Sequence, residues 1–216
     1  MQGAGERGAA VHVRRAHHDD LPAIRPVLAR ALAADPLMDW IFGPHPRREA
    51  AVAAFLWGPV EAYALAGTVW LAMAGEQAVG AAAWSVPGTQ KQATDGGADL
   101  PGRSMLDLLL PERHAARVRA GFESMHGRLP DEPHALLHLL GVDADRRGRG
   151  IGGALIRAGL AAIPADLPAH VNTTVEANVR LYESHGFLHV SSVRLGDTGP
   201  HMHGLRRPGA RAGQSR

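Results

Sequence analysis

The sequence predicts one mixed α/β domain, and two observations lead to this prediction. Segments with the alternating apolar pattern of strands recur along the chain between segments with the 3.6-residue period of helices. The chain has 216 residues, of which 45% are hydrophobic, and this is enough to build one domain with its own core. We therefore expect a single sheet with helices packed against it.

In the first half of the chain, strands are predicted at 11–15, 68–74 and 78–86, and helices at 19–34 and 47–65. Asp19 or Asp20 is expected to cap the first helix. Prolines and a glycine between residues 36 and 46 predict a loop after it. The two strands at 68–86 are joined by Gly75-Glu76-Gln77, which is typical of a hairpin.

In the second half, helices are predicted at 104–126, with a break at Pro111, and at 151–163 and 178–185. Strands are predicted at 134–142, 169–174, 187–194 and 200–206. The segment 87–102 is rich in Gly, Thr, Gln and Asp, and we expect it to be a mobile surface loop.

Both ends of the chain and its composition narrow the classes of function. Residues 1–8 lack the apolar stretch of a secretory signal and are expected to form a disordered leader, so the domain covers 9–207 and a flexible basic tail covers 208–216. No run of 18 apolar residues is present, so no membrane span is expected, and a cytoplasmic location follows.

Cysteine is absent, which excludes disulfides and thiolate catalysis. The net charge is only +2 with no basic stripe among aromatic residues, so no nucleic-acid partner is expected.

The most informative segment runs from Val142 to Arg157, where a predicted strand leads through an arginine-rich, glycine-rich turn into a helix. Glycines allow the backbone to turn sharply and to approach a ligand closely. The first amides of the helix lack intrahelical acceptors and carry the positive end of its dipole. The segment therefore predicts a site for a pyrophosphate group.

Two familiar phosphate-binding loops fit this segment poorly. A P-loop needs Lys followed by Ser or Thr after its last glycine, but Gly153 is followed by Ala154. A dinucleotide fingerprint should start at the end of its strand, whereas five residues, 143–147, separate the apolar run from Gly148. It should also precede most of a parallel sheet, and only about sixty residues follow here.

Two motifs resemble the GNAT acyl-CoA N-acyltransferases. Arg147-Gly-Arg-Gly-Ile-Gly152 resembles the Arg/Gln-x-x-Gly-x-Gly/Ala signature, and the segment from Asn178 to Phe187 resembles Asn-x-x-x-Tyr-x-x-x-Gly-Phe. The last predicted strand is similar to that of the puromycin N-acetyltransferase-like branch. The resemblance implies a mostly antiparallel sheet of about seven strands, splayed between strands 4 and 5, with helices on both faces. It also allows a homodimer, which is common in the family.

The resemblance implies acetyl-CoA as the co-substrate. Backbone groups of the fourth strand, at Leu140, Gly141 and Val142, would bind the pantetheine arm, together with Asn178. The pyrophosphate would be held by the loop that follows, which consists of Arg147, Gly148, Arg149, Gly150, Ile151, Gly152 and Gly153.

Attack of an amine on a thioester needs an acid for the departing thiolate and a base for the amine proton. Tyr182 matches the family's tyrosine near the sulfur and is the predicted acid, because a phenol is protonated at neutral pH. Packing in the core is its alternative role.

The sequence offers more than one candidate for the base. Members of the puromycin-like branch tend to carry a glutamate where this chain has Asn172, which cannot accept a proton but can hold a water. Glu176, four residues on, is one alternative. His138 is the candidate base, because strand alternation places it on one face with Leu140 and Val142; a structural histidine is the competing interpretation.

The resulting hypothesis is acetylation of a small-molecule amine, such as an antibiotic or another xenobiotic. Two alternatives stay open: acetylation of a peptide or protein amine, and a catalytically silent acyl-CoA sensor. His201 and His203 share one predicted strand face but lack a third ligand at a recognisable spacing, so no metal is expected.

Overall fold

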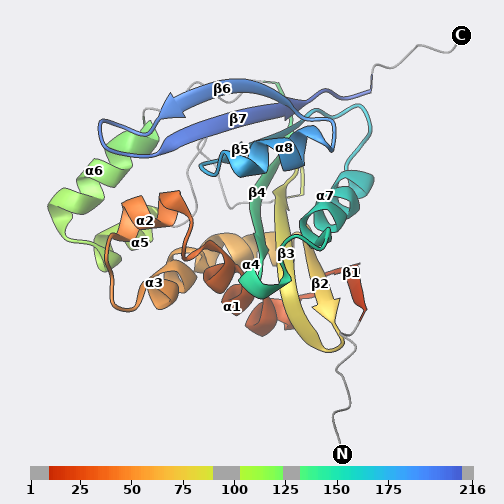
Figure 1. Ribbon diagram of the computed structural model, residues 1–216, viewed down its shortest axis with the longest axis horizontal. Helices are drawn as coiled ribbons and strands as arrows, with labels where there is room; N and C mark the ends of the chain where they lie inside the picture. The colour runs from red at the N-terminus through yellow and green to blue at the C-terminus, as the bar shows by residue number, and fades with distance from the viewer. Residues whose placement is uncertain (1–9, 90–102, 124–131, 211–216) are drawn as a thin grey trace, which may run out of the picture.

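The computed structural model describes residues 10–89, 103–123 and 132–210 (Figure 1). The strands are β1 (Val11–Arg15), β2 (Val69–Ala74), β3 (Gln77–Ser85), β4 (Ala135–Val142), β5 (Ala169–Thr173), β6 (Leu188–Arg194) and β7 (His201–Arg207). The helices are α1 (Leu21–Leu32), α2 (Pro36–Phe42), α3 (Arg48–Phe55), α4 (Trp57–Leu65), α5 (Arg103–Leu109), α6 (Glu112–Glu123), α7 (Ile151–Ala162) and α8 (Ala177–Glu183). Two short 3-10 turns are η1 (His18–Asp20) and η2 (Ala144–Arg146).

The seven strands form one sheet in the order β1-β2-β3-β4-β5-β7-β6. All neighbours are antiparallel except β4 and β5, which are parallel. β4 and β5 pair only from Ala135 opposite Ala169 to Leu137 opposite Val171, and both strands continue past this point without pairing. The predicted splay between the fourth and fifth strands is confirmed.

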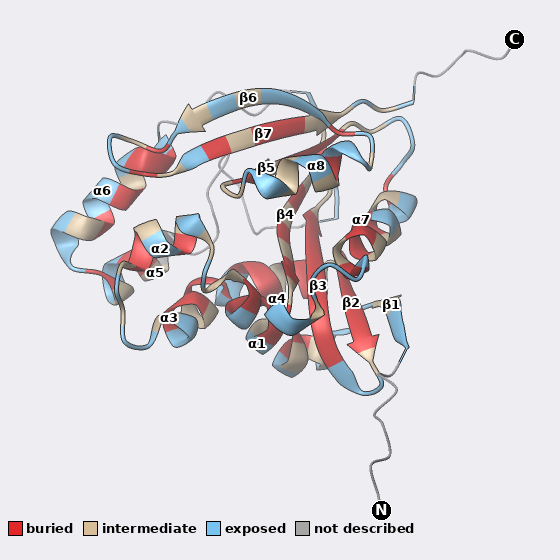
Figure 2. Ribbon diagram, in the orientation of Figure 1, coloured by how far each residue is buried: buried red, intermediate tan, exposed pale blue. Residues whose placement is uncertain are grey.

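Helices cover both faces of the sheet (Figure 1). One core cluster contains side chains from all of the helices α1 through α6, together with Val69, Leu71 and Met73 of β2. The other contains side chains from α7 and α8, together with Trp70 and Ala72 of β2. These residues alternate along β2, so a strand that is buried on both faces supplies both clusters. Figure 2 shows the buried residues along the central strands, whereas β6 at the edge is largely exposed.

The start of the first helix differs in detail from its prediction. α1 begins after Asp20, but the carboxylate of Asp20 does not cap it. Instead this carboxylate accepts from the backbone N–H of His17 at 2.7 Å and from both terminal nitrogens of Arg14 at 2.7 Å. The guanidinium is the stronger partner, and it joins β1 to the first turn of the helical layer.

The loop predicted at 36–46 is wrong over its first half, where the chain forms α2. Asp35 caps this helix by accepting from the N–H of Leu37 at 2.8 Å, Pro36 occupies the first turn, and Gly43 ends the helix with a φ of 58°. Asp-Pro at a helix start and Gly at its end are ordinary helix boundaries. The prolines and the glycine therefore delimit a short helix instead of preventing one.

The single helix predicted at 47–65 is wrong as well, since the chain forms α3 and α4 with Leu56 between them. Pro59 supplies the reason. A proline has no N–H to donate to the carbonyl four residues earlier, here Phe55, and its ring collides with that carbonyl. α3 ends at Phe55, and Pro59 lies in the first turn of α4, where it is tolerated.

A β-bulge in β4 changes which face His138 occupies. Ala83 of β3 lies opposite Leu139 and Trp84 lies opposite Leu137, so His138 is an extra residue with no partner across the ladder. Leu137 therefore packs in the α7-side cluster and Leu139 in the α1-side cluster. The prediction that His138 shares a face with Leu140 and Val142 is wrong, because the latter two pack against the α7-side cluster whereas His138 contacts Tyr63 of α4.

The remaining predicted elements are present with boundaries shifted by a few residues. The leader 1–8, most of the predicted mobile loop 87–102, residues 124–126 and the end of the tail 208–216 lie outside the described residues. At the start of that tail, Ala210 donates its N–H to the carbonyl of Ala165 at 2.7 Å. Within the described ranges, every helix is too short or too polar to cross a bilayer.

Candidate functional site

The N-terminus of α7 forms one side of an open cleft. The turn before this helix uses a positive φ at two glycines, 73° at Gly148 and 78° at Gly150, a conformation that other residues rarely adopt. Ala154 makes the first intrahelical bond, to the carbonyl of Gly150. The amides of residues 151–153 precede it and point out of the helix with the positive end of its dipole. The geometry suits an anion.

The cleft has a volume of about 400 Å³ and contains ten of the eleven predicted cofactor-binding residues. These ten are Leu140, Gly141, Val142, Arg147, Gly148, Gly150, Ile151, Gly152, Gly153 and Asn178. The cleft extends from the N-terminus of α7 to the part of β4 that β5 leaves unpaired. An elongated ligand with an anionic end therefore has both a phosphate site and a strand edge to bind.

The opposite wall comes from the last turn of α1 and the residues after it: Ala31, Leu32, Ala34 and Asp35. α1 lies very close to β4 here, because a Cβ at Gly141 would be 2.8 Å from the Cβ of Ala31. Only glycine fits at this position without moving the helix.

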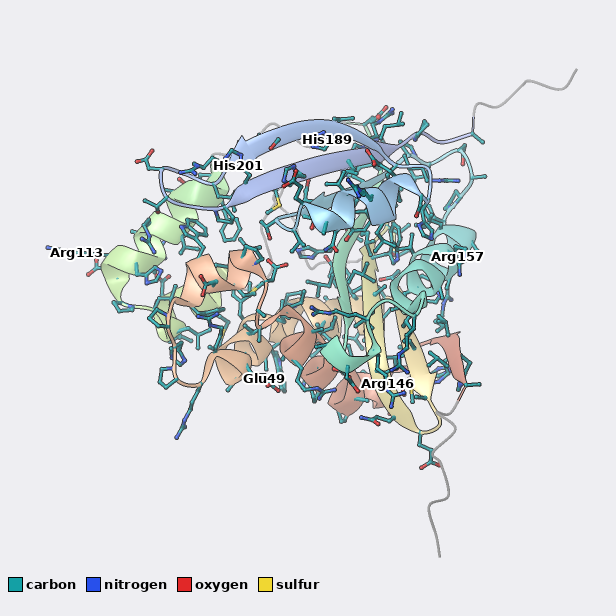
Figure 3. All side chains as sticks on the ribbon, viewed as in Figure 1. Glu49, Arg113, Arg146, Arg157, His189 and His201 are labelled. Atoms are coloured by element: carbon teal, nitrogen blue, oxygen red, sulfur yellow. The ribbon has the colours of Figure 1, made fainter. Side chains whose placement is uncertain are left out.

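Arg149 is the predicted cofactor-binding residue that does not line the cleft; its guanidinium donates to the carbonyl of Asp145 at 3.3 Å. The guanidinium of Arg147 also has protein partners, donating to the carbonyls of Ala31 at 2.8 Å and Val142 at 3.2 Å. Arg146 lines the cleft, and Figure 3 shows it beside the turn that leads from β4 to α7. The cleft is therefore cationic at the end where the helix dipole is positive.

Tyr182 lies on α8 and is 4% exposed; it does not itself line the cleft, although its neighbour Leu181 does. Its ring packs edge-on against Phe187, with ring centroids 6.0 Å apart. Burial raises the pKa of the Tyr182 phenol above its ordinary value, and the negative charge of Asp35 raises this pKa further. The phenol is therefore protonated over the whole physiological pH range.

His138 and Asn172 lie at the fork of the sheet, one residue beyond the last paired residues of β4 and β5. The Nδ1 atom of His138 is 2.7 Å from the hydroxyl of Tyr63, and burial lowers the pKa of His138 to about 4. Asn172 alternates with Val171, which packs on the α7 side, so it faces the α1 side as His138 does. Neither residue lines the cleft.

Asp35 is among the cleft-lining residues that the sequence interpretation missed. It is the carboxylate that lines the cleft, and its Oδ1 accepts from the N–H of Leu37 at 2.8 Å and from the hydroxyl of Thr174 at 2.7 Å. The second bond joins the α1–α2 connection to the end of β5 across the cleft. The signal was present in Asp35-Pro36, which is typical of a helix start.

The histidines of the β6–β7 hairpin lie away from this cleft. His201 is exposed, and the ring of His203 packs against that of His189 with centroids 5.5 Å apart. Figure 3 shows His189 and His201 along the hairpin, at the opposite end of the molecule from Arg146. Across the described part of the chain, no three His, Asp or Glu side chains converge as a metal site would require.

Comparisons of sequence and of structure both find similarity to acetyltransferases. The family model described as acetyltransferase (GNAT) domain matches residues 113–188. A structure from Corynebacterium glutamicum, named histone acetyltransferase HPA2 and related acetyltransferase, is 26% identical; the alignment covers 94% of this chain and 98% of that chain, with a TM-score of 0.69.

Two further structures are similar in fold at lower identity. Arylalkylamine N-acetyltransferase 2 from Aedes aegypti is 11% identical, with 92% of this chain and 98% of that chain covered and a TM-score of 0.63. A polyamine N-acetyltransferase from Drosophila melanogaster is 18% identical, with 91% and 99% covered and a TM-score of 0.53. The domain match and the structure from Corynebacterium glutamicum support an acetyltransferase, whereas these two structures of lower identity support the fold alone. Over residues 113–188 this chain matches the acetyltransferase (GNAT) domain, and its architecture as a whole is the GNAT fold.

Proposed function

We propose that this protein transfers an acetyl group from acetyl-CoA to the primary amine of a small molecule, by direct attack while both are bound. One observation carries the proposal: the cleft joins the free amides of α7 to the unpaired edge of β4, and Asp35 lies in the same cleft. A diphosphate fits the first part, a pantetheine amide fits the second, and a carboxylate beside the acyl group suits an amine.

Two groups of residues would hold the coenzyme, one at its diphosphate and one at its pantetheine arm. The amides of residues 151–153, with the charge of Arg146 and Arg147, would bind the diphosphate. Backbone groups of residues 140–142 and the side chain of Asn178 would bind the pantetheine arm. The bound thioester supplies the electrophilic carbonyl carbon.

Tyr182 and Asp35 form the acid–base pair in this proposal. The amine nitrogen attacks the thioester carbonyl carbon, the C–S bond breaks, and the departing thiolate takes the proton of the Tyr182 hydroxyl. The amine's surplus proton passes to Asp35, either directly or through one water; Oδ1 already accepts two hydrogen bonds, so we assign Oδ2 to this proton. Asp35 then releases this proton to solvent and the Tyr182 phenolate takes one up, which restores both groups for the next turnover. The two groups suit these roles because burial and the charge of Asp35 keep the phenol protonated.

His138 and Asn172 are assigned to the acceptor side of the fork and not to proton transfer. The Nδ1 of His138 is already bonded to Tyr63, and its lowered pKa makes it a weak base. A neutral imidazole and a carboxamide can still hydrogen-bond an incoming amine or its water.

A small amine is favoured as the acceptor by two of the neighbours described above, which are named for arylalkylamine and polyamine substrates. The puromycin-like branch suggested by the last strand adds aminonucleosides to the candidates. An antibiotic or other xenobiotic amine remains within this class.

Titration calorimetry with CoA, followed by thiol release from acetyl-CoA, tests the proposal. The amine panel contains agmatine, tryptamine, puromycin and a histone-tail peptide. We expect CoA binding and turnover with at least one small amine. Tyr182→Phe should bind CoA normally but lose about 10²-fold or more in kcat, because the phenol acts only on the leaving thiolate.

The other outcomes separate the alternatives. CoA binding without turnover on any amine favours an acyl-CoA sensor, and turnover restricted to the peptide favours a protein acetyltransferase. Absence of CoA binding at millimolar ligand overturns the proposal.

A further inference from the structure

Helix α1 is held at each end by an arginine–aspartate pair. At its start, both terminal nitrogens of Arg14 donate to the carboxylate of Asp20 at 2.7 Å. At its end, Nε and Nη2 of Arg30 donate to the two carboxylate oxygens of Asp143 at 3.1 Å. Both pairs use two parallel hydrogen bonds, the geometry in which an arginine–carboxylate pair is strongest and most directional. Asp143 immediately follows β4, so the second pair joins the end of α1 to the chain next to Val142, which lines the cleft.

A second connection reinforces the first at the same end of α1. The carbonyl of Ala31 lies in the last turn of the helix, where carbonyls have no intrahelical donor, and Nη2 of Arg147 donates to it at 2.8 Å. Nε of the same guanidinium donates to the carbonyl of Val142 at 3.2 Å. A cation at this position also offsets the negative end of the helix dipole.

The bond from Arg147 to Ala31 joins two residues that line the cleft, and the Arg30–Asp143 pair lies next to them in the chain, one residue from Ala31 and one from Val142. Ala31 and Leu32 line one wall, whereas Val142 and Arg147 line the other. Packing sets the lower limit of their separation, because Gly141 leaves no room between β4 and α1. The arginine bonds set the upper limit.

We infer that Arg30, Asp143 and Arg147 are positioning residues that fix the distance between α1 and the N-terminus of α7, and thereby the affinity for acetyl-CoA. This inference rests on the proposed function. Arg147 acts in addition through its charge, because it lies between the negative end of α1 and the site assigned to the diphosphate. Arg30 acts through Asp143 alone.

The inference predicts which kinetic constant changes. Asp35 lies three residues beyond α1 but has its own bonds to Leu37 and Thr174. Loosening the end of α1 should therefore weaken binding of the coenzyme while leaving the acid–base pair, Tyr182 and Asp35, in place. Affinity for CoA should fall, and kcat should stay nearly constant.

The test compares Arg30→Met with Arg14→Met. The two pairs are matched, since the side chains are 40% and 12% exposed in Arg30–Asp143 and 36% and 18% exposed in Arg14–Asp20. We expect Arg30→Met to raise the Kd for CoA and the KM for acetyl-CoA about tenfold, with kcat changed by less than about twofold. Arg14→Met should leave all three within about twofold, because its pair is remote from the cleft.

Two more variants separate position from charge. Arg30→Lys keeps the charge but loses the planar fork, so its Kd should lie between those of wild type and Arg30→Met. Arg147→Gln keeps a donor for the Ala31 carbonyl and should bind CoA more tightly than Arg147→Met. The salt dependence of Kd should be the same in wild type and Arg30→Met, because Arg30 bonds Asp143 and not the ligand.

Equal CoA affinities in Arg30→Met and Arg14→Met would overturn this inference while leaving the proposed function intact. A reduced salt dependence in Arg30→Met would also overturn it, because it would mean direct contact with the diphosphate. Wild-type protein that binds no CoA would instead overturn the proposed function. If Arg30→Met does not fold in circular dichroism, the comparison of Arg30→Lys with Arg14→Lys replaces it with the same expected order.

Discussion

Asp35 has both a structural role and an electrostatic role. Its Oδ1 caps α2 and accepts the hydroxyl of Thr174, while its charge raises the pKa of Tyr182. A residue with a structural reason to be fixed is well suited to catalysis, because its carboxylate is already oriented before a substrate arrives.

We predict that Asp35→Asn lowers kcat by about 10²-fold, the usual contribution of a general base, and leaves the KM for acetyl-CoA unchanged. Asparagine can still cap α2, so the fold should survive. Thr174→Val is the matched control, since it removes the hydroxyl that orients Asp35 but keeps the carboxylate, and its effect on kcat should be smaller. An unchanged kcat in Asp35→Asn would remove Asp35 from the mechanism.

The same substitution should change the titration of Tyr182. Loss of the Asp35 charge should bring the pKa of the phenol closer to its ordinary value, although burial still holds it above that value. The chain has two tyrosines, so ultraviolet titration of phenolate in a Tyr63→Phe background reports on Tyr182 alone. A pKa that is unaffected by Asp35→Asn would contradict the electrostatic coupling between the two residues.

At the scale of elements, the contact between α7 and β3 depends on a missing side chain. A Cβ at Gly159 would overlap the indole ring of Trp84, which is fully buried. α7 can therefore lie directly on the sheet, and this contact helps to hold its N-terminus at the cleft.

Gly159→Ala should destabilise the protein by about 1–3 kcal/mol, because overpacking of the core outweighs the gain in helix propensity of about 1 kcal/mol. Gly58→Ala is the control, since a Cβ at that helical position meets nothing within 4 Å and should be neutral or slightly stabilising. Urea unfolding measures both. Equal stabilities of the two variants would mean that the Trp84 ring moves aside at little cost.

The elements that the sequence predicted wrongly share one property, a proline or glycine at a helix boundary. Pro36 and Gly43 predict a loop although they delimit α2, and Pro59 falls within one continuous predicted helix although it marks the start of α4. The β-bulge at His138 left no comparable signal, because it depends on how β3 pairs with β4 and on no feature of β4 alone.

At the scale of the whole molecule, two histidines make folding sensitive to acid. Burial lowers the pKa of His138 to about 4, and burial together with the charges of His134 and Arg206 lowers that of His170 to about 4. An unfolded histidine titrates near 6.5. Below that pH the unfolded chain binds protons that the folded protein does not, so stability falls between pH 6.5 and pH 4.

We expect the free energy of unfolding to decrease by as much as about 1.4 kcal/mol per pH unit for each histidine in this window. His170→Leu should flatten the slope by about half, whereas His201→Gln, at an exposed position, should leave it unchanged. Asp20 adds a second decrease below about pH 4, since Arg14 lowers its pKa to about 2. Urea unfolding at several pH values measures the slope, and constant stability between pH 6.5 and pH 4 would contradict the prediction.

The sequence by itself determined the order of most elements, the phosphate-binding turn at residues 147–153 and ten of the residues that line the cleft. Such features depend on periodicity and on short motifs, which are local properties of the chain. Only the tertiary structure placed Asp35 opposite Thr174, Arg30 beside Asp143 and Tyr63 on His138. Each of these pairs joins residues that are 75 or more positions apart, and no local pattern specifies which distant side chain completes a hydrogen bond.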